Sequence, residues 1–280
     1  MIEVISPGGL TTIQDLGRPG WAHLGVSPSG AADAQSYRLA NRLVGNPAGA
    51  AALEATIRGP VLRFGTAAVV ALTGAPVKAR IGPRPVAMHA ATEVRRGEVL
   101  DVGFATTGAR TYLAVRGGIL ATPVLGSAST DMLSGLGPPA LAEGTRLTVG
   151  DGPLTPQPPE PAQASPPPAE PVLRVVPGPR DDRFAPDALS LLSGTAWEVS
   201  AASNRVGVRL HGPSLAPVDE TELQSEGLVT GSIQVPPSGQ PILLLNDHPT
   251  TGGYPVLAVV TAADLPLAGQ LRPGDRVAFR

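Results

Sequence analysis

The sequence predicts a mainly β protein with two domains, and three observations support this prediction. Its 280 residues include 34 Gly and 32 Pro but only 4 Phe, 2 Trp and 3 Tyr, a composition that favours turns and short strands over long helices. A chain of this length usually forms two hydrophobic cores rather than one. A Pro-rich stretch at residues 155–171 also divides the chain.

The Pro-rich stretch reads TPQPPEPAQASPPPAEP and has no large apolar side chain to bury. Such a composition is typical of a semi-rigid, extended linker. We therefore expect an N-terminal domain at residues 1–154, a linker at 155–171 and a C-terminal domain at 172–280.

Helices are expected in only a few places. After a long polar loop at residues 6–30, Ser29 or Asp33 can cap a helix that ends before Pro47. Asn46 and Pro47 also predict a second short helix, from residue 47 to about residue 55. In the C-terminal domain a helix is expected at 186–193 and a shorter turn at 263–268.

Strands are expected in most of the remaining chain. Runs of β-branched and apolar residues bounded by Gly or Pro predict strands at 2–5, 61–64, 68–72, 99–102, 112–115, 146–149, 206–210 and 242–245. Closing a sheet removes its exposed edges, so two compact β-barrels with one or two helices each account for this pattern.

The composition excludes several classes of function. A net charge of −2 and few aromatic side chains provide no face for nucleic acid. The apolar runs are far shorter than the roughly 20 residues that span a bilayer, and the N-terminus lacks the pattern of a secretory signal. We therefore expect a cytoplasmic protein that binds neither nucleic acid nor membrane.

Cofactor chemistry is restricted in the same way. The absence of Cys excludes disulfides and thiolate catalysis. The four His do not have zinc-like spacing, so we expect no bound metal. Lys78 is the only lysine, and the chain has neither a Gly-Lys-Ser/Thr phosphate loop nor a biotin attachment motif.

Polar residues gather after the apolar strand at 242–245. That strand leads directly into Asn246, Asp247 and His248 and then into a Thr-Thr-Gly-Gly-Tyr loop. With positive φ angles, Gly252 and Gly253 could direct their N–H groups toward an anion or a carbonyl. Asp247 or His248 could then move a proton. The alternative is a tight turn with no chemical role.

Two further segments carry candidate side chains. The loop at 6–30 presents Gln14, Asp15 and Arg18, and Arg18 could bind a carboxylate through two hydrogen bonds. Alternatively, an Asp15–Arg18 pair only holds the loop together. Arg205, in the segment Ser203-Asn-Arg-Val-Gly207, could clamp a substrate anion or could be a surface arginine.

Several long motifs occur in order along the chain: TIQDLGRPGWAHLGVSPSGAAD, RLANRLVGNPAGAAALE, YLAVRGG, VLGSAST, LQSEGLVTGSIQVPPSGQPILLLNDHPTTGGYP and LRPGDRV. With these motifs the chain resembles the biotin-dependent carboxyltransferase family of the allophanate hydrolase subunit 2 type, over nearly its whole length apart from the Pro-rich stretch. The resemblance implies two tandem cyclophilin-like β-barrel domains with a few short helices.

Members of this family include the C-type subunit of ATP-dependent 5-oxoprolinase. The resemblance implies a hydrolase subunit that helps to open the lactam of 5-oxo-L-proline to give L-glutamate and is inactive alone. It implies an obligatory B-type partner, in a heterodimer or heterotetramer, and an A-type subunit that completes the reaction. ATP and Mg²⁺ are then expected for the complex, with no cofactor bound covalently to this chain.

The resemblance also implies site residues, position by position. Asp247, Glu226 and Arg205 are expected to be catalytic. The expected substrate-binding residues are Gln14, Asp15, Arg18, Ser225, Gln234, Gln240, Thr250, Thr251, Gly252, Gly253 and Tyr254. The chain departs from the family pattern at Pro249, where Gln is more common, and at Asn204, where Asp is more common. Pro249 removes a side-chain amide from the candidate site.

Two other functions stay open from the sequence. A carboxyltransferase acting on urea or a related amide would need biotin on a partner chain, because this chain has no attachment motif for it. A regulatory protein that antagonises a kinase inhibitor through a B-type partner would need no catalysis. Peptidyl-prolyl isomerisation rests on fold analogy alone.

Overall fold

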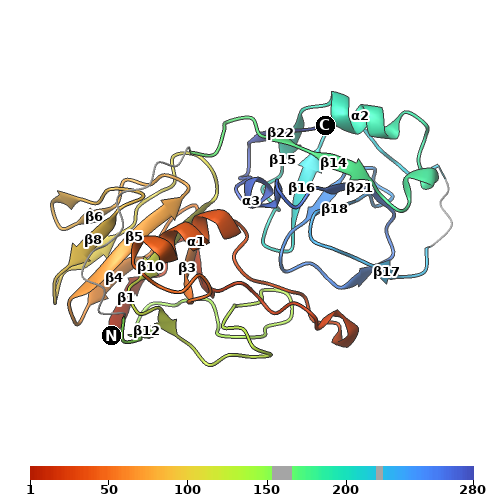
Figure 1. The fold of residues 1–280 in the computed structure, drawn as a ribbon. Helices are drawn as coiled ribbons and strands as arrows, with labels where there is room; N and C mark the ends of the chain where they lie inside the picture. Colours follow the sequence, from red (N-terminus) through yellow and green to blue (C-terminus); the bar gives the residue numbers. More distant parts are fainter. Residues whose placement is uncertain (153–165, 219–222) are drawn as a thin grey trace.

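The computed structural model describes residues 1–152, 166–218 and 223–280, and it shows two β-rich halves that contact each other (Figure 1). The strands up to residue 149 form two sheets, and those from residue 172 onward form a separate set. The predicted mainly β fold with a few short helices is confirmed. Most of the linker predicted at 155–171 lies outside the described residues, so the domain boundary stays a prediction.

One sheet of the N-terminal half has the strand order β11-β12-β1-β4-β9-β6-β7. All its paired strands are antiparallel. Its strands are β1 (Ile2–Ser6), β4 (Val61–Phe64), β6 (Arg80–Ile81), β7 (Arg84–Pro85), β9 (Val99–Asp101), β11 (Ile119–Leu120) and β12 (Arg146–Val149). The strands predicted at 2–5, 61–64, 99–102 and 146–149 therefore match to within one residue.

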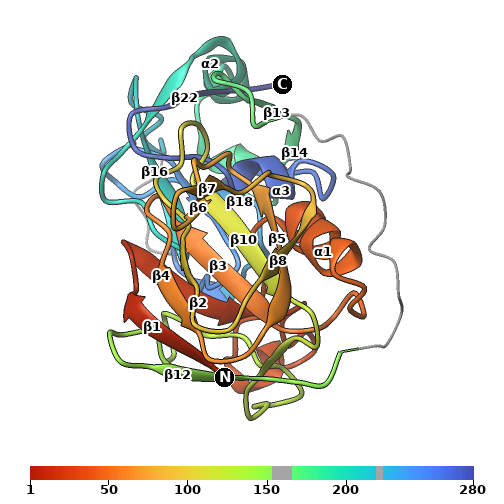
Figure 2. The same ribbon diagram turned by 90° about the vertical axis from the view of Figure 1, so that its left-hand side faces the viewer.

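The other sheet of this half has the order β2-β3-β10-β5-β8 (Figure 2). Its strands are β2 (Leu10–Gln14), β3 (Ala52–Thr56), β5 (Ala68–Gly74), β8 (Ala91–Val94) and β10 (Arg110–Val115). Apolar side chains from both sheets share one buried core, which includes Ile2, Leu62 and Phe64 from the first sheet and Leu53, Leu72 and Leu113 from the second.

Two local predictions in this half are wrong. Residues 10–14 form strand β2 inside the segment predicted to be a loop, and residues 52–56 form strand β3 where a helix was predicted. Strand β3 pairs with β2 on one side and with β10 on the other. These two ladders, and burial of four of its five residues, outweigh the helix preference of an alanine-rich segment.

The predicted cap of the first helix is confirmed. Helix α1 (Ala34–Leu43) begins after Asp33, whose carboxylate accepts a hydrogen bond from the Ser36 N–H at 2.9 Å. Tyr37, Ala40 and Leu43 on its inner face pack with Ala71, Tyr112 and Ala114 of the β10–β5 sheet. The loop before it contains a short 3₁₀ helix, η1 (Ala22–Leu24).

The C-terminal half is built around a sheet of order β13-β22-β15-β16-β19-β18-β21-β14. Its strands are β13 (Val172–Leu173), β14 (Val175–Pro177), β15 (Trp197–Val199), β16 (Gly207–His211), β18 (Ser232–Gln234), β19 (Ile242–Leu244), β21 (Val256–Val260) and β22 (Arg276–Phe279). Only Arg174 separates β13 from β14, so the two edges of the sheet are held together and the sheet is nearly closed.

Small elements complete this half. A short ribbon pairs β17 (Glu226–Gly227) with β20 (Thr251–Gly252). The helical segments are η2 (Asp181–Arg183), α2 (Ala188–Gly194) and α3 (Leu265–Ala268). The helix predicted at 186–193 is therefore confirmed, and the shorter turn predicted at 263–268 contains the one-turn helix α3. A second buried core contains Trp197, Leu243 and Phe279. No helix within the described residues is long and apolar enough to cross a membrane.

Candidate functional site

A buried ion cluster lies where the two halves meet. Arg205 donates from Nε to Asp247 Oδ2 at 2.9 Å and from Nη2 to Asp247 Oδ1 at 3.0 Å. Its Nη1 forms a short ion pair with Oε1 of Glu54 on β3. Each of these three side chains is almost completely buried. The cluster therefore joins a carboxylate of the N-terminal half to a cation of the C-terminal half.

Glu54 is surrounded by donors. Its Oε2 accepts hydrogen bonds from the Ala32 N–H at 2.9 Å and from the Tyr112 hydroxyl at 2.8 Å. Its Oε1 also lies 3.4 Å from Nε of Arg110. Burial raises the pKa of Glu54, but Arg205, Arg110 and these hydrogen bonds outweigh burial and bring the pKa below its usual value. Glu54 is therefore an ionised counter-ion.

Arg205 remains a cation for a related reason. Burial lowers the pKa of Arg205, but Glu54 and Asp247 outweigh burial and raise the pKa above its usual value. Every nitrogen of its guanidinium donates to one of these carboxylates, and Nη2 also donates to the Gly30 carbonyl at 2.8 Å. Arg205 therefore links the two halves, and its catalytic role stays a prediction.

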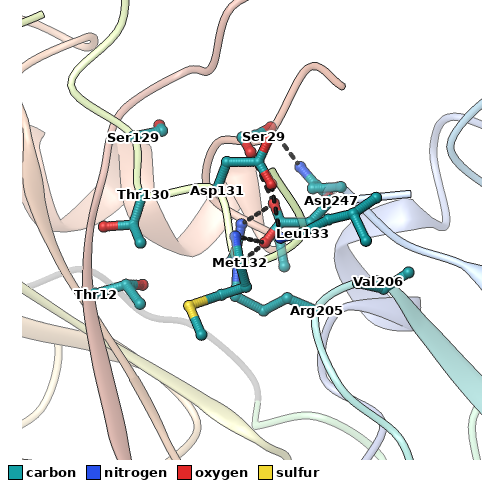
Figure 3. Close-up of polar contacts among 12 residues, drawn as sticks. Thr12, Ser29, Ser129, Thr130, Asp131, Met132, Leu133, Arg205, Val206 and Asp247 are labelled. Carbon is teal, nitrogen blue, oxygen red and sulfur yellow. Dashed lines mark hydrogen bonds and ion pairs between the residues drawn. The ribbon is translucent and has the colours of Figure 1, made fainter. Parts of the chain in front are cut away.

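Asp247 accepts hydrogen bonds from both halves of the molecule (Figure 3). Besides Arg205, the Ser29 hydroxyl donates to its Oδ1 at 2.8 Å and the Met132 N–H donates to its Oδ2 at 3.1 Å. These bonds fill the roughly four acceptor positions of a carboxylate. Asp247 thus fixes the loop that follows it, and proton transfer by Asp247 stays a prediction.

The loop that carries Met132 is organised by Asp131. Its Oδ1 accepts from the Leu133 and Ser134 N–H groups at 2.9 and 3.1 Å, and its Oδ2 accepts from the Ser27 hydroxyl at 2.9 Å. Burial raises the pKa of Asp131, but a short hydrogen bond from the Ser134 hydroxyl and these other bonds outweigh burial and lower the pKa below its usual value. Asp131 therefore holds the 131–134 loop beside Asp247 as an anion.

A second polar contact between the halves involves Gln270. Its Oε1 accepts from the Ala109 and Arg110 N–H groups at 3.1 and 2.9 Å, and its Nε2 donates to Asp33 Oδ2 at 2.8 Å. Asn246 adds bonds to the Ser29 and Ala31 carbonyls at 3.2 and 3.3 Å. The halves therefore dock through buried, specific hydrogen bonds.

Asp15 and Arg18 do not form the direct ion pair considered from the sequence. Asp15 Oδ1 accepts from the Ser127 and Ser129 hydroxyls, both at 2.6 Å, and its Oδ2 accepts from the Ala128 N–H at 2.6 Å. Arg18 donates from Nε to the Val124 carbonyl at 3.3 Å and makes a short bond to the Ser129 carbonyl. Both residues therefore hold the loop to residues 124–129.

Gln14, the last residue of β2, is fully buried. Its Nε2 donates to the Thr130 carbonyl and the Thr12 hydroxyl, both at 3.0 Å. Gln14 Oε1, Arg18 Nη1 and Thr130 Oγ1 are buried without a hydrogen-bond partner in the described part of the chain. Their substrate-binding roles stay predictions, because these atoms are enclosed in the present arrangement.

Most of the predicted C-terminal residues meet at the β17–β20 ribbon. Glu226 pairs with Gly252, Thr251 pairs with Gly227, and the Leu228 N–H donates to the Thr250 carbonyl at 2.9 Å. Gln234, beneath them, donates from Nε2 to the Tyr254 carbonyl at 3.0 Å. Thr251 and Tyr254 are exposed, as is Ser225. This ribbon offers an accessible polar surface.

Glu226 is already paired with a cation. Arg180 donates from Nε to both of its carboxylate oxygens, at 3.0 and 3.1 Å, and forms a short contact through Nη2. The hydrogen bond with Arg180 lowers the pKa of Glu226 below its usual value. Glu226 is therefore an anion at neutral pH, which suits charge stabilisation better than proton donation.

The positive φ angles expected at Gly252 and Gly253 do not occur in the structure. Gly252 has an extended conformation because it belongs to strand β20. A Cβ atom there would lie 2.8 Å from Nε2 of Gln234 and 2.9 Å from Cδ1 of Leu228. Close packing, rather than a left-handed turn, therefore accounts for Gly252, and these two glycines do not form the expected cradle of N–H groups.

Gln240 lies apart from the other predicted residues. Its Oε1 accepts from the Gly212 N–H at 3.0 Å and its Nε2 donates to the Gly212 carbonyl at 3.2 Å, which joins two loops. His248 is buried with Nδ1 2.7 Å from the Pro249 carbonyl, and burial lowers its pKa. Both contacts are of the kind that stabilise turns.

Several residues of the junction and of the β17–β20 ribbon were not predicted from the sequence. They are Glu54, Arg110, Tyr112, Ser29, Asp131, Arg180 and Gln270. One signal was present: Glu54 is the only charged residue in the apolar run Ala51-Ala-Leu-Glu-Ala55, and a buried charge requires a partner. Within the part of the chain that the structure describes, no cluster of His and acidic residues is arranged to hold a metal.

The fold and the junction together define a two-part, mainly β protein whose polar loops gather between the two halves. The chain belongs to the family described as "carboxyltransferase domain, subdomain A and B", whose model matches residues 24–280. The family predicted from the sequence motifs is thereby confirmed.

Two named relatives show the range of this family. The chain is 38% identical over 290 residues to the C-type subunit of 5-oxoprolinase from Escherichia coli strain K12, an alignment that covers 100% of this chain and 90% of that protein. It is 35% identical over 311 residues to urea amidolyase of Lachancea kluyveri, covering 99% of this chain but 17% of that protein.

Solved structures have the same fold. The structure of TTHA0988 matches with a TM-score of 0.91 and 38% identity, over 100% of this chain and 55% of the TTHA0988 chain. The present chain thus spans about half the length of that solved chain. In urea amidolyase and TTHA0988, the region that matches this chain is part of a longer polypeptide.

Proposed function

We propose that this chain is the C-type subunit of a multi-subunit, ATP-dependent 5-oxoprolinase that converts 5-oxo-L-proline to L-glutamate. The observation that carries this proposal is the similarity to the Escherichia coli protein of that name, over 90% of its length. The corresponding 5-oxoprolinase protein of Haemophilus influenzae is 34% identical, again over 90% of its length. The urea amidolyase match, by contrast, accounts for a small part of a larger protein.

The proposed complex contains a B-type and an A-type subunit. Exposed apolar side chains on the loop that contacts Asp247 support a docking surface at the junction: Met132, whose N–H donates to Asp247, is 45% exposed, and its neighbour Leu133 is 50% exposed. Apolar side chains that are exposed together often mark protein interaction sites. We place the B-type subunit on this surface, where it would complete the active site.

Opening a lactam is difficult because resonance stabilises the amide, so the proposed complex uses ATP and Mg²⁺ for activation. The accessible hydroxyls of Ser225, Thr251 and Tyr254 can bind the substrate carboxylate or the oxygen on which negative charge develops. Arg205 and Asp247 position the loop that leads to Thr251. Gln14, Asp15 and Arg18 would contribute through the adjoining loop, together with Gln234, Thr250, Gly252 and Gly253 on the ribbon side.

Reconstitution tests the proposal. The chain is co-expressed with its B-type and A-type subunits, and ATP-dependent release of glutamate from 5-oxoproline is measured with each component omitted in turn. We expect release only from the complete mixture. An absence of release from a complete and correctly assembled mixture would contradict the proposal.

A matched pair of variants tests the role of the ribbon. Thr251→Val should lower glutamate release by roughly tenfold or more if the hydroxyl stabilises the transition state. Thr148→Val, at an exposed position on β12 in the other half, should leave the rate unchanged. Equal rates for both variants would remove Thr251 from the site.

A urea carboxylase function is the second candidate, because the chain is also 35% identical to urea amidolyase. It requires biotin on a partner chain, and it predicts incorporation of labelled bicarbonate into urea. A purely regulatory role, in which the chain antagonises a kinase inhibitor, predicts B-type binding without turnover of either substrate.

A further inference from the structure

A small cavity of about 120 Å³ lies between the two halves. Thr56 and Arg110 line it from the N-terminal half, and Asn204 and Arg205 line it from the C-terminal half. Its lining contains no Asp or Glu among the described residues. Two arginines and neutral polar residues therefore contribute to the cavity wall.

Arg110 has unused hydrogen-bonding capacity, whereas Arg205 does not. Arg205 donates from all three nitrogens to Asp247, Glu54 and Gly30. Arg110 is 3% exposed, and its Nη1 donates to the Gly269 carbonyl. Its Nε is buried without a hydrogen bond, and its Nη2 has no acceptor within residues 1–152, 166–218 and 223–280.

Glu54 does not satisfy Arg110. The nearest approach is 3.4 Å, from Arg110 Nε to Glu54 Oε1, which is too long for a strong hydrogen bond. Glu54 already accepts from Arg205, the Ala32 N–H and the Tyr112 hydroxyl. The described residues therefore give Arg110 an ion pair with Glu54 but no hydrogen-bond acceptor for its Nε or Nη2.

Two neutral side chains in the cavity wall can also donate hydrogen bonds. Asn204 Oδ1 accepts from the Val206 and Gly207 N–H groups at 2.8 and 3.3 Å, which leaves its Nδ2 as the free end of the amide. Among the described residues, neither Asn204 Nδ2 nor the Thr56 hydroxyl has a hydrogen-bond partner. A cation, an amide N–H and a hydroxyl are a donor set suited to an anion.

We propose that this cavity binds a small carboxylate-type anion between Arg110, Asn204 and Thr56. Since a water molecule occupies about 30 Å³ in the liquid, the volume limits the ligand to a compact anion such as bicarbonate or the carboxylate of a small organic acid. The anion contacts both halves, so its binding stabilises their docking. This inference does not depend on the proposed 5-oxoprolinase function.

Thermal unfolding of the whole chain tests the proposal, with acetate and bicarbonate as probes and chloride at equal ionic strength as the reference. At about a hundredfold excess over Kd, the bound anion should raise Tm by roughly 5 °C. A rise with acetate shows that organic carboxylates bind, and a rise with bicarbonate alone identifies bicarbonate as the ligand. No rise over chloride with either probe overturns the proposal.

Asn204→Asp provides the decisive variant. Asp keeps the Oδ1 acceptor for Val206 and Gly207 but places a negative charge at the cavity, so the Tm in chloride should be unchanged and the response to the anion lost. Gln224→Glu adds the same charge at an exposed position outside the cavity lining and should respond like the unmodified chain. An undiminished response in Asn204→Asp contradicts the proposal.

A second measurement avoids mutation. Line broadening of ¹³C-labelled acetate by the unmodified chain should be relieved by unlabelled bicarbonate, because both compete for one site. The absence of broadening at millimolar acetate, together with no rise of Tm in bicarbonate, would show that the cavity holds only water.

Discussion

At the residue scale, the junction between the two halves depends on charges that are both buried and paired. Glu54, Arg110, Arg205 and Asp247 contribute two carboxylates and two cations, each at most 3% exposed. Replacing a whole buried ion pair by apolar residues is often neutral, but removing one partner leaves an uncompensated charge. The junction is therefore most sensitive to single substitutions.

Glu54→Gln tests this sensitivity. The amide has the same shape but no charge, so Arg205 and Arg110 would both lose a counter-ion. We expect the free energy of unfolding to fall by about 3–5 kcal/mol, measured by urea denaturation. Glu93→Gln, at an exposed position on β8, should change it by less than about 0.5 kcal/mol. A similarly small effect of Glu54→Gln would show that the ion pairs contribute little.

At the element scale, local sequence patterns predicted some segments and failed at others for identifiable reasons. Strand β4 and helix α1 were found because their signals are local, namely an apolar run and the Asp33 cap. Strand β3 was mistaken for a helix because its strand conformation comes from pairing with β2 and β10. Pairing with strands that are distant along the chain cannot be predicted from the residues of the segment itself.

The same difference applies to the candidate site. The Asp247 loop could be found because polar residues follow an apolar strand directly. The partners of Asp247 could not be found, because Ser29 is 218 residues away and Met132 is 115 residues away in the sequence. Ser29 and Met132 belong to no sequence pattern that indicates a site, and they meet Asp247 only in the folded chain.

The loop that carries Met132 depends on Gly137. Its φ is +82°, and a Cβ atom there would lie 2.1 Å from the Ser129 carbonyl oxygen and 3.1 Å from Nη2 of Arg18. Gly135 also has a positive φ, +72°, but open space around it. Gly135→Ala should lower the free energy of unfolding by about 1 kcal/mol. Gly137→Ala should lower it by more, because of the clash, and urea denaturation measures both values. Equal effects would show that the loop relaxes away from the clash.

At the scale of the whole molecule, the contact between the two halves involves ionised carboxylates. The stability of the molecule is therefore expected to depend on pH. Because the pKa of Glu54 is below its usual value in the folded state, its stabilising contribution is complete above the unfolded pKa of about 4.3 and is lost as the pH falls through the folded pKa. The pKa of Asp131 is lowered as well, so it acts in the same direction.

Thermal unfolding between about pH 7 and pH 3 measures this effect. We expect Tm to be nearly constant down to about pH 5 and then to fall steeply, with a shallower fall in Glu54→Gln, which has no carboxylate to titrate. Parallel curves for the two proteins would show that the junction does not control acid stability.

The most direct test of the proposed function is a comparison of substrates in one assembly. The chain, purified with the B-type and A-type proteins that bind it, is supplied with ATP and Mg²⁺ and either 5-oxoproline or urea with labelled bicarbonate. We predict glutamate release from 5-oxoproline that requires all three chains, and no label in urea. Labelled urea derivatives without glutamate release would contradict the account and identify the chain as part of a urea carboxylase.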